Sequence, residues 1–323
     1  MGSRKYLLRK IGQAFFTLIF VLAANFFLFR ILPSDPATMY AKANKLTAEQ
    51  KQQLIKDWGL NEPIATQLVL YISHPLNFGY SQQSDRLVKD VIGERIWPTL
   101  LLVGISTILS TIFGVLIGIS SAWRRGSKTD VSWLVSTMTF YSMPDFWFGM
   151  MLLLVFAAGL HWFPVGGMET PPEIADYTGL AHIWDVARHL FLPVATLTIG
   201  YLGEYSLIMR SSLIDVMNED FVGVARAKGL QDKAVRRKHA VPNALLPIVT
   251  MVILYFGYIL GGAVGVETVF SYPGLGLLTY DAIQSQDFPV MQAVFLLLSF
   301  SVILANLIAD ITYGYLDPRV REA

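Results

Sequence analysis

Residues 240–266 read AVPNALLPIVTMVILYFGYILGGAVGV and contain no Asp, Glu, Lys or Arg. Residues 96–123 and 288–309 form two further charge-free runs. Each run is long enough for the roughly 20 apolar residues of a helix that spans a bilayer. A buried helix of a soluble protein could explain one such run, but three indicate an all-α polytopic membrane protein. The low share of charged residues, 15%, agrees, because soluble domains carry about 25%.

The same patterning predicts six transmembrane helices, namely Ile11–Ile31, Pro98–Ala122, Val131–Leu160, Leu190–Met209, Leu246–Val266 and Phe288–Ala309. The first apolar run is longer than the core of a signal peptide and has no small-residue cleavage site, so we interpret it as an uncleaved span. We therefore predict three parts. They are an N-terminus with the first helix (1–32), a small extracytoplasmic subdomain (33–97), and a five-helix core (98–323) with a cytoplasmic loop at 210–245.

The distribution of basic residues predicts that both termini are cytoplasmic. In that orientation 16 of the 25 Lys and Arg residues lie inside, seven of them in the 210–245 loop, as the positive-inside rule requires. The third predicted span is unusually long, about 45 Å for 30 helical residues, and Pro144 lies near its middle. It is either one kinked helix or a hairpin of two short spans. The hairpin would export the seven basic residues, so the charge pattern favours the kinked helix.

Local signals predict details of the segments around the spans. Residues 47–50 form a capping box, and Gly59 can end the short helix that it starts. Residues 161–189 have the composition of a loop with a helical patch. Five glycines are expected to serve close helix packing: Gly114, Gly118, Gly261, Gly262 and Gly265.

The segment before the opening stretch carries basic and small residues together. Residues 220–230 read DFVGVARAKGL and favour a helix that ends at Gly229. The basic residues 236–238 could simply lie on anionic headgroups. That explanation does not account for the small residues at 223, 225, 227 and 229, which would let a helix sit deep in a groove of a partner. A short helix held parallel to the membrane suits the transmission of motion.

This segment resembles the coupling loop of permease subunits from binding-protein-dependent ABC importers. The family pattern is Glu-Ala-Ala, three residues, Gly, nine residues, an apolar residue, a spacer and Leu-Pro. Gly229 and Pro242 keep this spacing, while Gly223 replaces the glutamate and His239 replaces the apolar residue. These departures resemble the dipeptide/oligopeptide/nickel branch, which has Ala-Arg-Ala-Lys-Gly-Leu, then His and Asn-Ala-Leu-Leu-Pro. That branch often carries Arg at the position of Pro242, so contacts made by the arginine do not carry over.

The resemblance extends over nearly the whole chain. Four further segments match motifs of the branch in order: Arg30–Pro36, Trp58–Pro63, Glu267–Gly276 and Leu316–Arg319. It implies a subunit of the prokaryotic plasma membrane that forms half of a translocation pathway for peptides. Nickel chelates and oligosaccharides remain alternative substrates. The implied partners are a second, similar permease, two ATPase subunits that bind ATP and Mg, an extracytoplasmic binding protein and membrane lipid.

The resemblance also implies which residues couple the subunit to the ATPase: Val222, Ala225, Arg226, Ala227, Lys228, Gly229, Leu230 and His239. The chain has no Gly-x-x-x-x-Gly-Lys-Ser/Thr loop to cradle phosphates, so any ATPase is a separate polypeptide.

Ionisable residues inside spans are candidates for the pathway, and the stretch after the fifth span is a candidate outer gate. The predicted set is Asp145, Glu204, Glu267, Tyr272, Pro273 and Gly274. The alternative for the stretch 267–276 is a plain membrane-surface loop, because Tyr-Pro-Gly favours a turn. The rival function is an ion-coupled secondary transporter, for which only Asp145 and Glu204 are available.

Other classes of function find little support in the composition. The net charge of +1 gives no case for nucleic-acid binding, and the chain has no cysteine for thiol catalysis, disulfides or metal. The five histidines form no metal-ligand pattern. We therefore predict a transporter subunit that is not an enzyme and holds no cofactor of its own.

Overall fold

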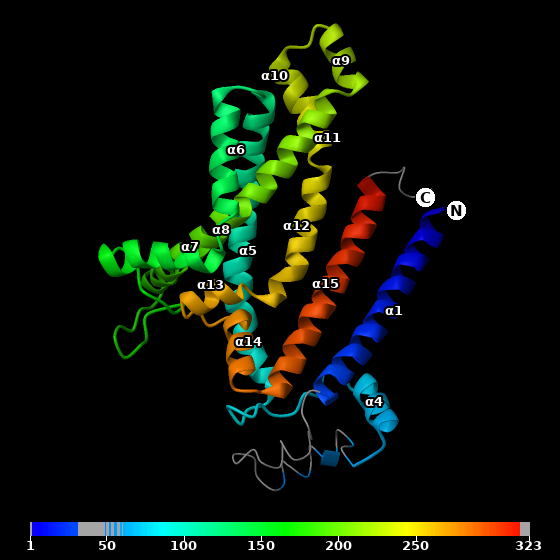
Figure 1. The fold of residues 1–323 in the computed structure, drawn as a ribbon, viewed down its shortest axis with the longest axis vertical. Helices are drawn as coiled ribbons and strands as arrows, with labels where there is room; N and C mark the ends of the chain where they lie inside the picture. The colour runs from blue at the N-terminus through cyan, green and yellow to red at the C-terminus, as the bar shows by residue number, and fades with distance from the viewer. Residues whose placement is uncertain are drawn as a thin grey trace. The chain divides into compact units, whose positions relative to one another are not determined.

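A computed structural model of the chain describes residues 2–31 and 61–316, together with positions 49, 52, 55, 56 and 59. Within these residues every named element is a helix (Figure 1), and the one β-type pairing is an isolated bridge between Tyr80 and Leu87. The predicted all-α class is therefore confirmed. The predicted capping box at 47–50 and the motifs at 30–36 and 316–319 fall mostly outside the described residues.

Four described helices are long and apolar enough to cross a membrane. They are α1 (Gly2–Ile31), α5 (Val88–Trp123), α8 (Leu180–Met217) and α15 (Phe288–Leu316). Two bent pairs pass the same test, so counting each pair as one span gives the six that were predicted. The first pair joins α6 (Lys128–Tyr141) to α7 (Asp145–Leu152) and its π-helical extension Leu153–Gly159. The second joins residues 232–244 to α12 (Leu246–Tyr258).

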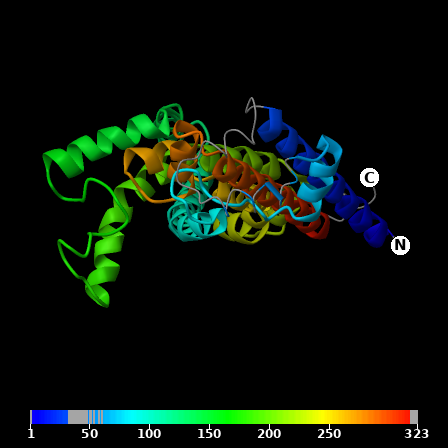
Figure 2. The same cartoon turned by 90° about the horizontal axis from the view of Figure 1, so that it is seen from below.

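The third predicted span differs from both forms that the sequence allowed. The helix stops at Tyr141, and α7 begins after Pro144 at an angle of 96° to α6. Pro144 has an extended backbone, with φ −60° and ψ 128°. Its ring disfavours helical geometry at the preceding residue, and it has no N–H to continue the hydrogen-bond ladder. A single kinked helix is therefore incorrect here, and α7 runs to the side of α5 and α6 (Figures 1 and 2).

The boundaries of other spans also move. The fifth span ends at a 3₁₀ turn, Ile259–Gly261, because Gly262 has a φ of +69°. A separate helix, α13 (Val264–Val269), follows, so the predicted end at Val266 is too late. By contrast α8 is longer than predicted and includes the last ten residues of the supposed 161–189 loop. Hydropathy marks only the apolar part of a helix, whereas polar turns continue it outside the bilayer.

The chain divides into two compact units, which we describe separately. The first comprises 1–99, 257–264 and 273–307. Its helices include α1, α4 (Ile64–Ser73), α14 (Leu275–Gln284) and most of α15. The backbone N–H of Leu275 donates to the Thr99 hydroxyl at 2.7 Å, and the Ser81 hydroxyl donates to Asp287 at 2.6 Å. The first bond joins the start of α14 to α5. The second joins the loop before α5 to the residue that precedes α15.

The second unit comprises 100–256, 265–272 and 308–323, and in it α5 packs closely on α8. A Cβ placed on Gly118 would lie 2.7 Å from the Cβ of Met209 and 2.7 Å from the carbonyl oxygen of Ser206. Gly114 approaches Tyr205 one turn earlier in the same way. The prediction of close packing is confirmed at these two glycines, where α5 has no room for a larger side chain.

The substitution Gly118→Ala is therefore expected to destabilise the protein by roughly 1–3 kcal/mol through overpacking. Thermal unfolding in detergent measures this. The matched control is Gly104→Ala on the same helix, where a Cβ meets nothing within 4 Å, so the melting temperature should stay level or rise because alanine favours helix. Equal losses in both variants would contradict the close approach of the two helices.

Candidate functional site

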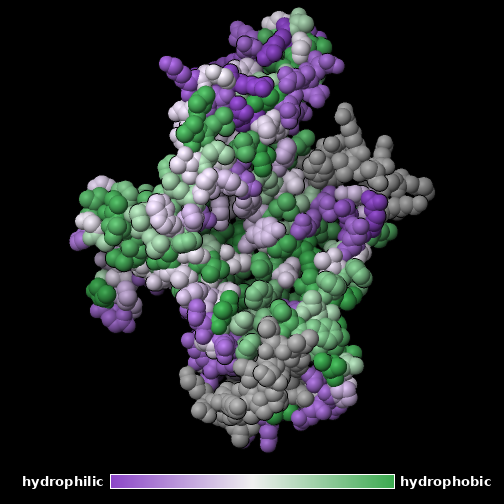
Figure 3. All heavy atoms as spheres, viewed as in Figure 1, coloured by the Kyte–Doolittle hydropathy of each residue, from purple (hydrophilic) through white to green (hydrophobic). Residues whose placement is uncertain are grey.

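The predicted coupling segment follows α8 as a compact group of short helices. These are α9 (Asp220–Ala227), α10 (Asp232–Val235), a π-helical turn (Arg236–Ala240) and α11 (Val241–Ala244). Hydrophilic side chains gather over α9 and α10, at the top of Figure 3. Beneath them Val222, Ala225 and Val235 are buried and form a small core to which Val216 of α8 adds. The inner side of α9 is thus fixed to its own chain.

The end of α9 has the hydrogen bonds of a Schellman motif. The N–H of Gly229 donates to the carbonyl of Arg226 at 2.9 Å, and the N–H of Leu230 donates to that of Ala225 at 3.4 Å. Gly229 has a φ of +81°, a left-handed conformation that glycine adopts without steric cost. The prediction that Gly229 ends this helix is confirmed.

The outer side of α9 is exposed and partly apolar. Phe221 and Val224 are 41% and 53% exposed, and Leu230 just beyond the helix is 41% exposed. The sequence reasoning missed Phe221 and Val224, although their spacing of three puts them on one helix face. The guanidinium of Arg226 lies 3.4 Å from the carboxylate of Asp232. A short helix with a fixed inner side and an apolar outer side is suited to docking on another protein.

The predicted coupling residues therefore separate into two groups. Val222 and Ala225 face inward, whereas Arg226, Ala227, Lys228, Gly229 and Leu230 are exposed. His239 lies apart from them in the π turn and is half-buried, and its carbonyl accepts a 2.7 Å hydrogen bond from the Asn243 amide.

The π turn has a local cause in the sequence. Pro242 has no N–H, so it cannot donate to the carbonyl of Lys238 four residues earlier. Instead the N–H of Val241 reaches the carbonyl of Arg236, five residues back, which is the hydrogen bond of a π-helix.

A buried ion pair holds three helices together beside the coupling segment. The guanidinium of Arg210 on α8 donates to both carboxylate oxygens of Asp130, at 2.9 Å each. Asp130 lies in the first turn of α6, is 2% exposed, and also accepts from the Ser121 hydroxyl of α5 and from the N–H of Gly126 at 2.9 Å. Sequence reasoning missed this cluster, because nothing local indicates that residues 80 positions apart will pair.

The two acidic pathway candidates meet neighbouring turns of α8, Asp145 from α7 and Glu204 as a residue of α8 itself. Asp145, at the start of α7, packs against Gly200 of α8, where any side chain would collide with its carboxylate. Glu204 is the next turn along and accepts a hydrogen bond from the Tyr255 hydroxyl of α12. The rings of Tyr201 and Tyr205 each lie 5.5 Å from that of Tyr255. Both acids thus lie along α8, and Glu204 belongs to a cluster of three tyrosines.

The candidate outer-gate stretch is more enclosed than a surface loop. Glu267 and Tyr272 are fully buried, and the N–H of Tyr272 donates to the Glu267 carbonyl at 2.8 Å. Next to them, the carbonyl of Phe270 accepts from the N–H of Gly167 at 2.9 Å. Residues 264–269 and 275–284 are helical, so only a short turn containing Pro273 and Gly274 separates two helices, and in it Ser271 is exposed and Pro273 half-buried.

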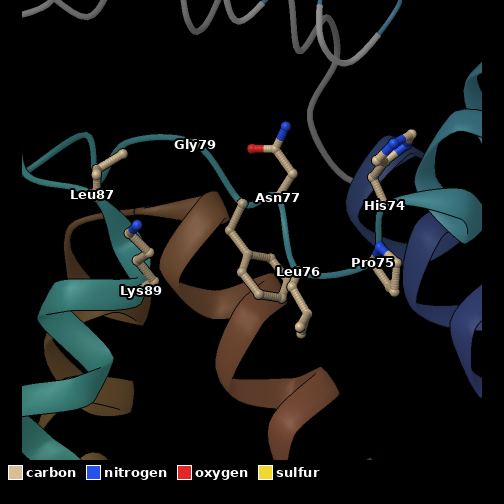
Figure 4. A pocket seen from close by; sticks show the side chains of 8 residues that line it. His74, Pro75, Leu76, Asn77, Gly79, Leu87 and Lys89 are labelled. Atoms are coloured by element: carbon tan, nitrogen blue, oxygen red, sulfur yellow. The ribbon is translucent and has the colours of Figure 1, made fainter.

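The first unit has a hollow of its own on the segment after α4. A cavity of about 490 Å³ is lined by residues 74–79 together with Leu87 and Lys89. Figure 4 shows His74 and Lys89 at its opposite ends. None of the predicted site residues lines it, so it stays outside the candidate site.

Known proteins resemble this chain over nearly its whole length. Residues 114–322 match the family model "Binding-protein-dependent transport system inner membrane component", and residues 3–77 match the model for the N-terminal part of such components. The chain is 36% identical to the glutathione transport system permease protein GsiC of Salmonella paratyphi A over 98% of each chain. It is 34% identical to the oligopeptide transport system permease protein AppB of Bacillus subtilis, also over 98% of each. The chain therefore belongs to the family of inner membrane components of binding-protein-dependent transport systems.

Proposed function

We propose that this chain is a permease subunit of an ATP-driven importer and forms half of a translocation pathway for peptides. Family membership supports the transport class, and the names of the relatives, which refer to glutathione and oligopeptides, support the substrate class. The observation that carries the proposal is α9, whose inner side is anchored on Val222 and Ala225 while its outer side stays exposed. Nickel chelates and oligosaccharides remain alternative substrates.

The proposed assembly adds four kinds of partner. They are a second, similar permease, two ATPase subunits that hold ATP and Mg, an extracytoplasmic binding protein and the lipid of the prokaryotic plasma membrane. Both termini and the 210–245 loop would lie in the cytoplasm, and the 33–97 subdomain would receive the binding protein. This orientation follows from the basic residues, most of which then lie inside.

In this mechanism the chain transmits motion and does not catalyse a reaction. Closure of the ATPase dimer would push on the exposed side of α9, including Arg226, and on Lys228 and Leu230 just after it. The core of Val222, Ala225 and Val235 would pass the displacement to α8 as a rigid body, because Val216 packs on the same core. The pathway would then alternate between inward-facing and outward-facing states by differential contacts in each.

The test is copurification of the full chain from its native membrane in mild detergent, followed by reconstitution. We expect a second permease, an ATPase and a binding protein, with uptake that requires ATP on the cytoplasmic side. Ligand retained by the binding protein would distinguish peptides from nickel chelates or oligosaccharides. A folded chain that purifies alone and takes up substrate along an ion gradient would overturn the proposal in favour of a secondary transporter.

Glu204 and Asp145 are the proposed polar residues of the pathway, and Glu204→Gln tests this role. The amide keeps the size of the side chain and its capacity to accept from Tyr255, but removes the charge. We expect ATP-driven peptide uptake to fall several-fold, while peptide affinity of the isolated binding protein is unchanged. The matched control is Glu173→Gln, an exposed residue of the loop before α8. Full uptake by the Glu204→Gln variant would exclude a role for its charge.

A further inference from the structure

A cluster of basic residues surrounds a cavity beside the coupling segment. The cavity has a volume of about 360 Å³ and lies between the end of α5 and the α10–α11 region. Its lining residues are Leu116, Ile119, Ser120, Trp123, Arg124, Lys233, Arg236, Arg237 and Val241. The guanidinium of Arg236 lies 5.5 Å above the ring of Trp123, a cation–π contact that holds it at the cavity.

The four cations of this cavity are not neutralised by the part of the chain that the structure describes. No ion pair there involves Arg124, Lys233, Arg236 or Arg237, and the neighbouring Asp232 is turned to Arg226 at 3.4 Å. A concentration of positive charge in a concave site attracts an anion. The cavity therefore offers a place for a phosphate group.

A second cavity adjoins the first and is apolar. It has a volume of about 490 Å³ and lies between α5 and α12. Its lining residues are Thr111, Ile112, Val115, Leu116, Leu245, Ile248, Val249, Val252 and Ile253. The hydroxyl of Thr111 donates to the carbonyl of Thr107 at 2.7 Å, so its donor is already used. Leu116 lines both cavities, so they lie next to each other along α5, and we refer to the two together as the α5 groove.

We propose that this groove binds one anionic phospholipid, with its phosphate among the four basic residues and an acyl chain between α5 and α12. A free phosphate would use only the basic part, and a neutral lipid only the apolar part. A basic pocket beside spanning helices on the cytoplasmic side is suited to anionic headgroups, and Trp123 is of the residue type that favours the interface. The assignment rests on the proposed cytoplasmic position of the 210–245 loop, but not on the identity of the substrate.

The site would make coupling depend on the surrounding lipid. Arg236 and Arg237 belong to the π turn, which connects α10 with α11 and so with α12. A phosphate held by these residues and by Arg124 would tie that turn to the end of α5. Binding of the lipid would thus limit movement of the π turn relative to α5 inside the second unit, and loss of the lipid would allow it.

Native mass spectrometry of the full chain in mild detergent tests this directly, with phosphatidylglycerol, phosphatidylcholine and glycerol phosphate as probes. We expect one phosphatidylglycerol to bind at least tenfold more tightly than phosphatidylcholine, and glycerol phosphate to compete poorly. The double variant Arg236→Gln/Arg237→Gln should lose at least tenfold in phosphatidylglycerol affinity. Ile112→Trp, which fills the apolar part without a change of charge, should also weaken it.

The control is Arg125→Gln/Lys128→Gln, which removes the same charge from two exposed residues that line neither cavity. Each variant must keep the wild-type melting temperature in phosphatidylcholine. Equal weakening by this control would reduce the effect to general surface charge, and equal affinity for both lipids would show that the basic residues do not select the headgroup; either result would overturn the site. Efficient competition by glycerol phosphate would identify an anion site without an acyl chain. Because the measured quantity is lipid binding, failure of the importer proposal would leave this result interpretable.

Discussion

Replacing Arg210 with methionine is expected to cost about 3–5 kcal/mol of stability, because it leaves a buried carboxylate without its counter-charge. Asp130 is 2% exposed and receives both of its charged hydrogen bonds from Arg210, each at 2.9 Å. The remaining donors, Ser121 and the N–H of Gly126, are neutral and cannot compensate for the lost charge. Unfolding of the purified chain in detergent, followed by circular dichroism, measures the change.

Two further variants separate charge from geometry. Arg210→Lys keeps the charge but not the paired donors of the planar guanidinium. The stability of this variant should therefore lie between that of wild type and that of Arg210→Met. The double variant Asp130→Asn/Arg210→Met removes the uncompensated charge and should recover part of the loss, which a double-mutant cycle quantifies. Wild-type stability of Arg210→Met would show that the pair does not hold these helices together.

Replacing Gly229 with valine is expected to reduce peptide-stimulated ATP hydrolysis of the assembled importer at least tenfold while the chain still folds. The φ of +81° is strained for a β-branched residue, at a cost of the order of 1–3 kcal/mol. A Cβ at this position meets nothing within 4 Å, so the effect arises from the backbone and not from collision. The end of α9 would change shape, and with it the exposed surface offered to the ATPase.

The informative comparison for this prediction is Gly229→Asn, since asparagine tolerates the left-handed conformation better than other side chains. It should retain much of the coupling that Gly229→Val loses. ATP hydrolysis is measured in proteoliposomes with the binding protein and peptide, and basal hydrolysis serves as the internal reference. If both variants couple as well as wild type, the geometry of this helix end has no part in transmission.

The parts of the fold that the sequence predicts well are those governed by the bilayer. A membrane forces every backbone polar group to be satisfied within the segment, so a charge-free run such as 288–309 reliably becomes a helix, here α15. Gly229 was predictable for a similar reason, because the end of a helix depends on a few neighbouring residues.

The features that escaped prediction depend on contacts between distant segments or on breaks inside apolar runs. Asp130 and Arg210 each look like a residue at the edge of a span, and only the packing of α6 on α8 reveals their pairing. The run 240–266 looks uniform in hydropathy, although Gly262 separates α13 from α12 and its 3₁₀ turn. The inward direction of Ala225 likewise depends on Val235, which follows after a turn.

The π turn at 236–240 also bears on which changes of length this protein can accept. It contains one residue more than an α-helical turn would need, and each residue of a helix rotates everything that follows by about 100°. An insertion or deletion between Asp232 and Pro242 would therefore turn α12 about its axis and carry the buried Ala244 and Ile248 away from their core. In the descent of such a gene, the exposed positions of this segment can exchange their amino acids, but the number of residues in the helical part cannot change.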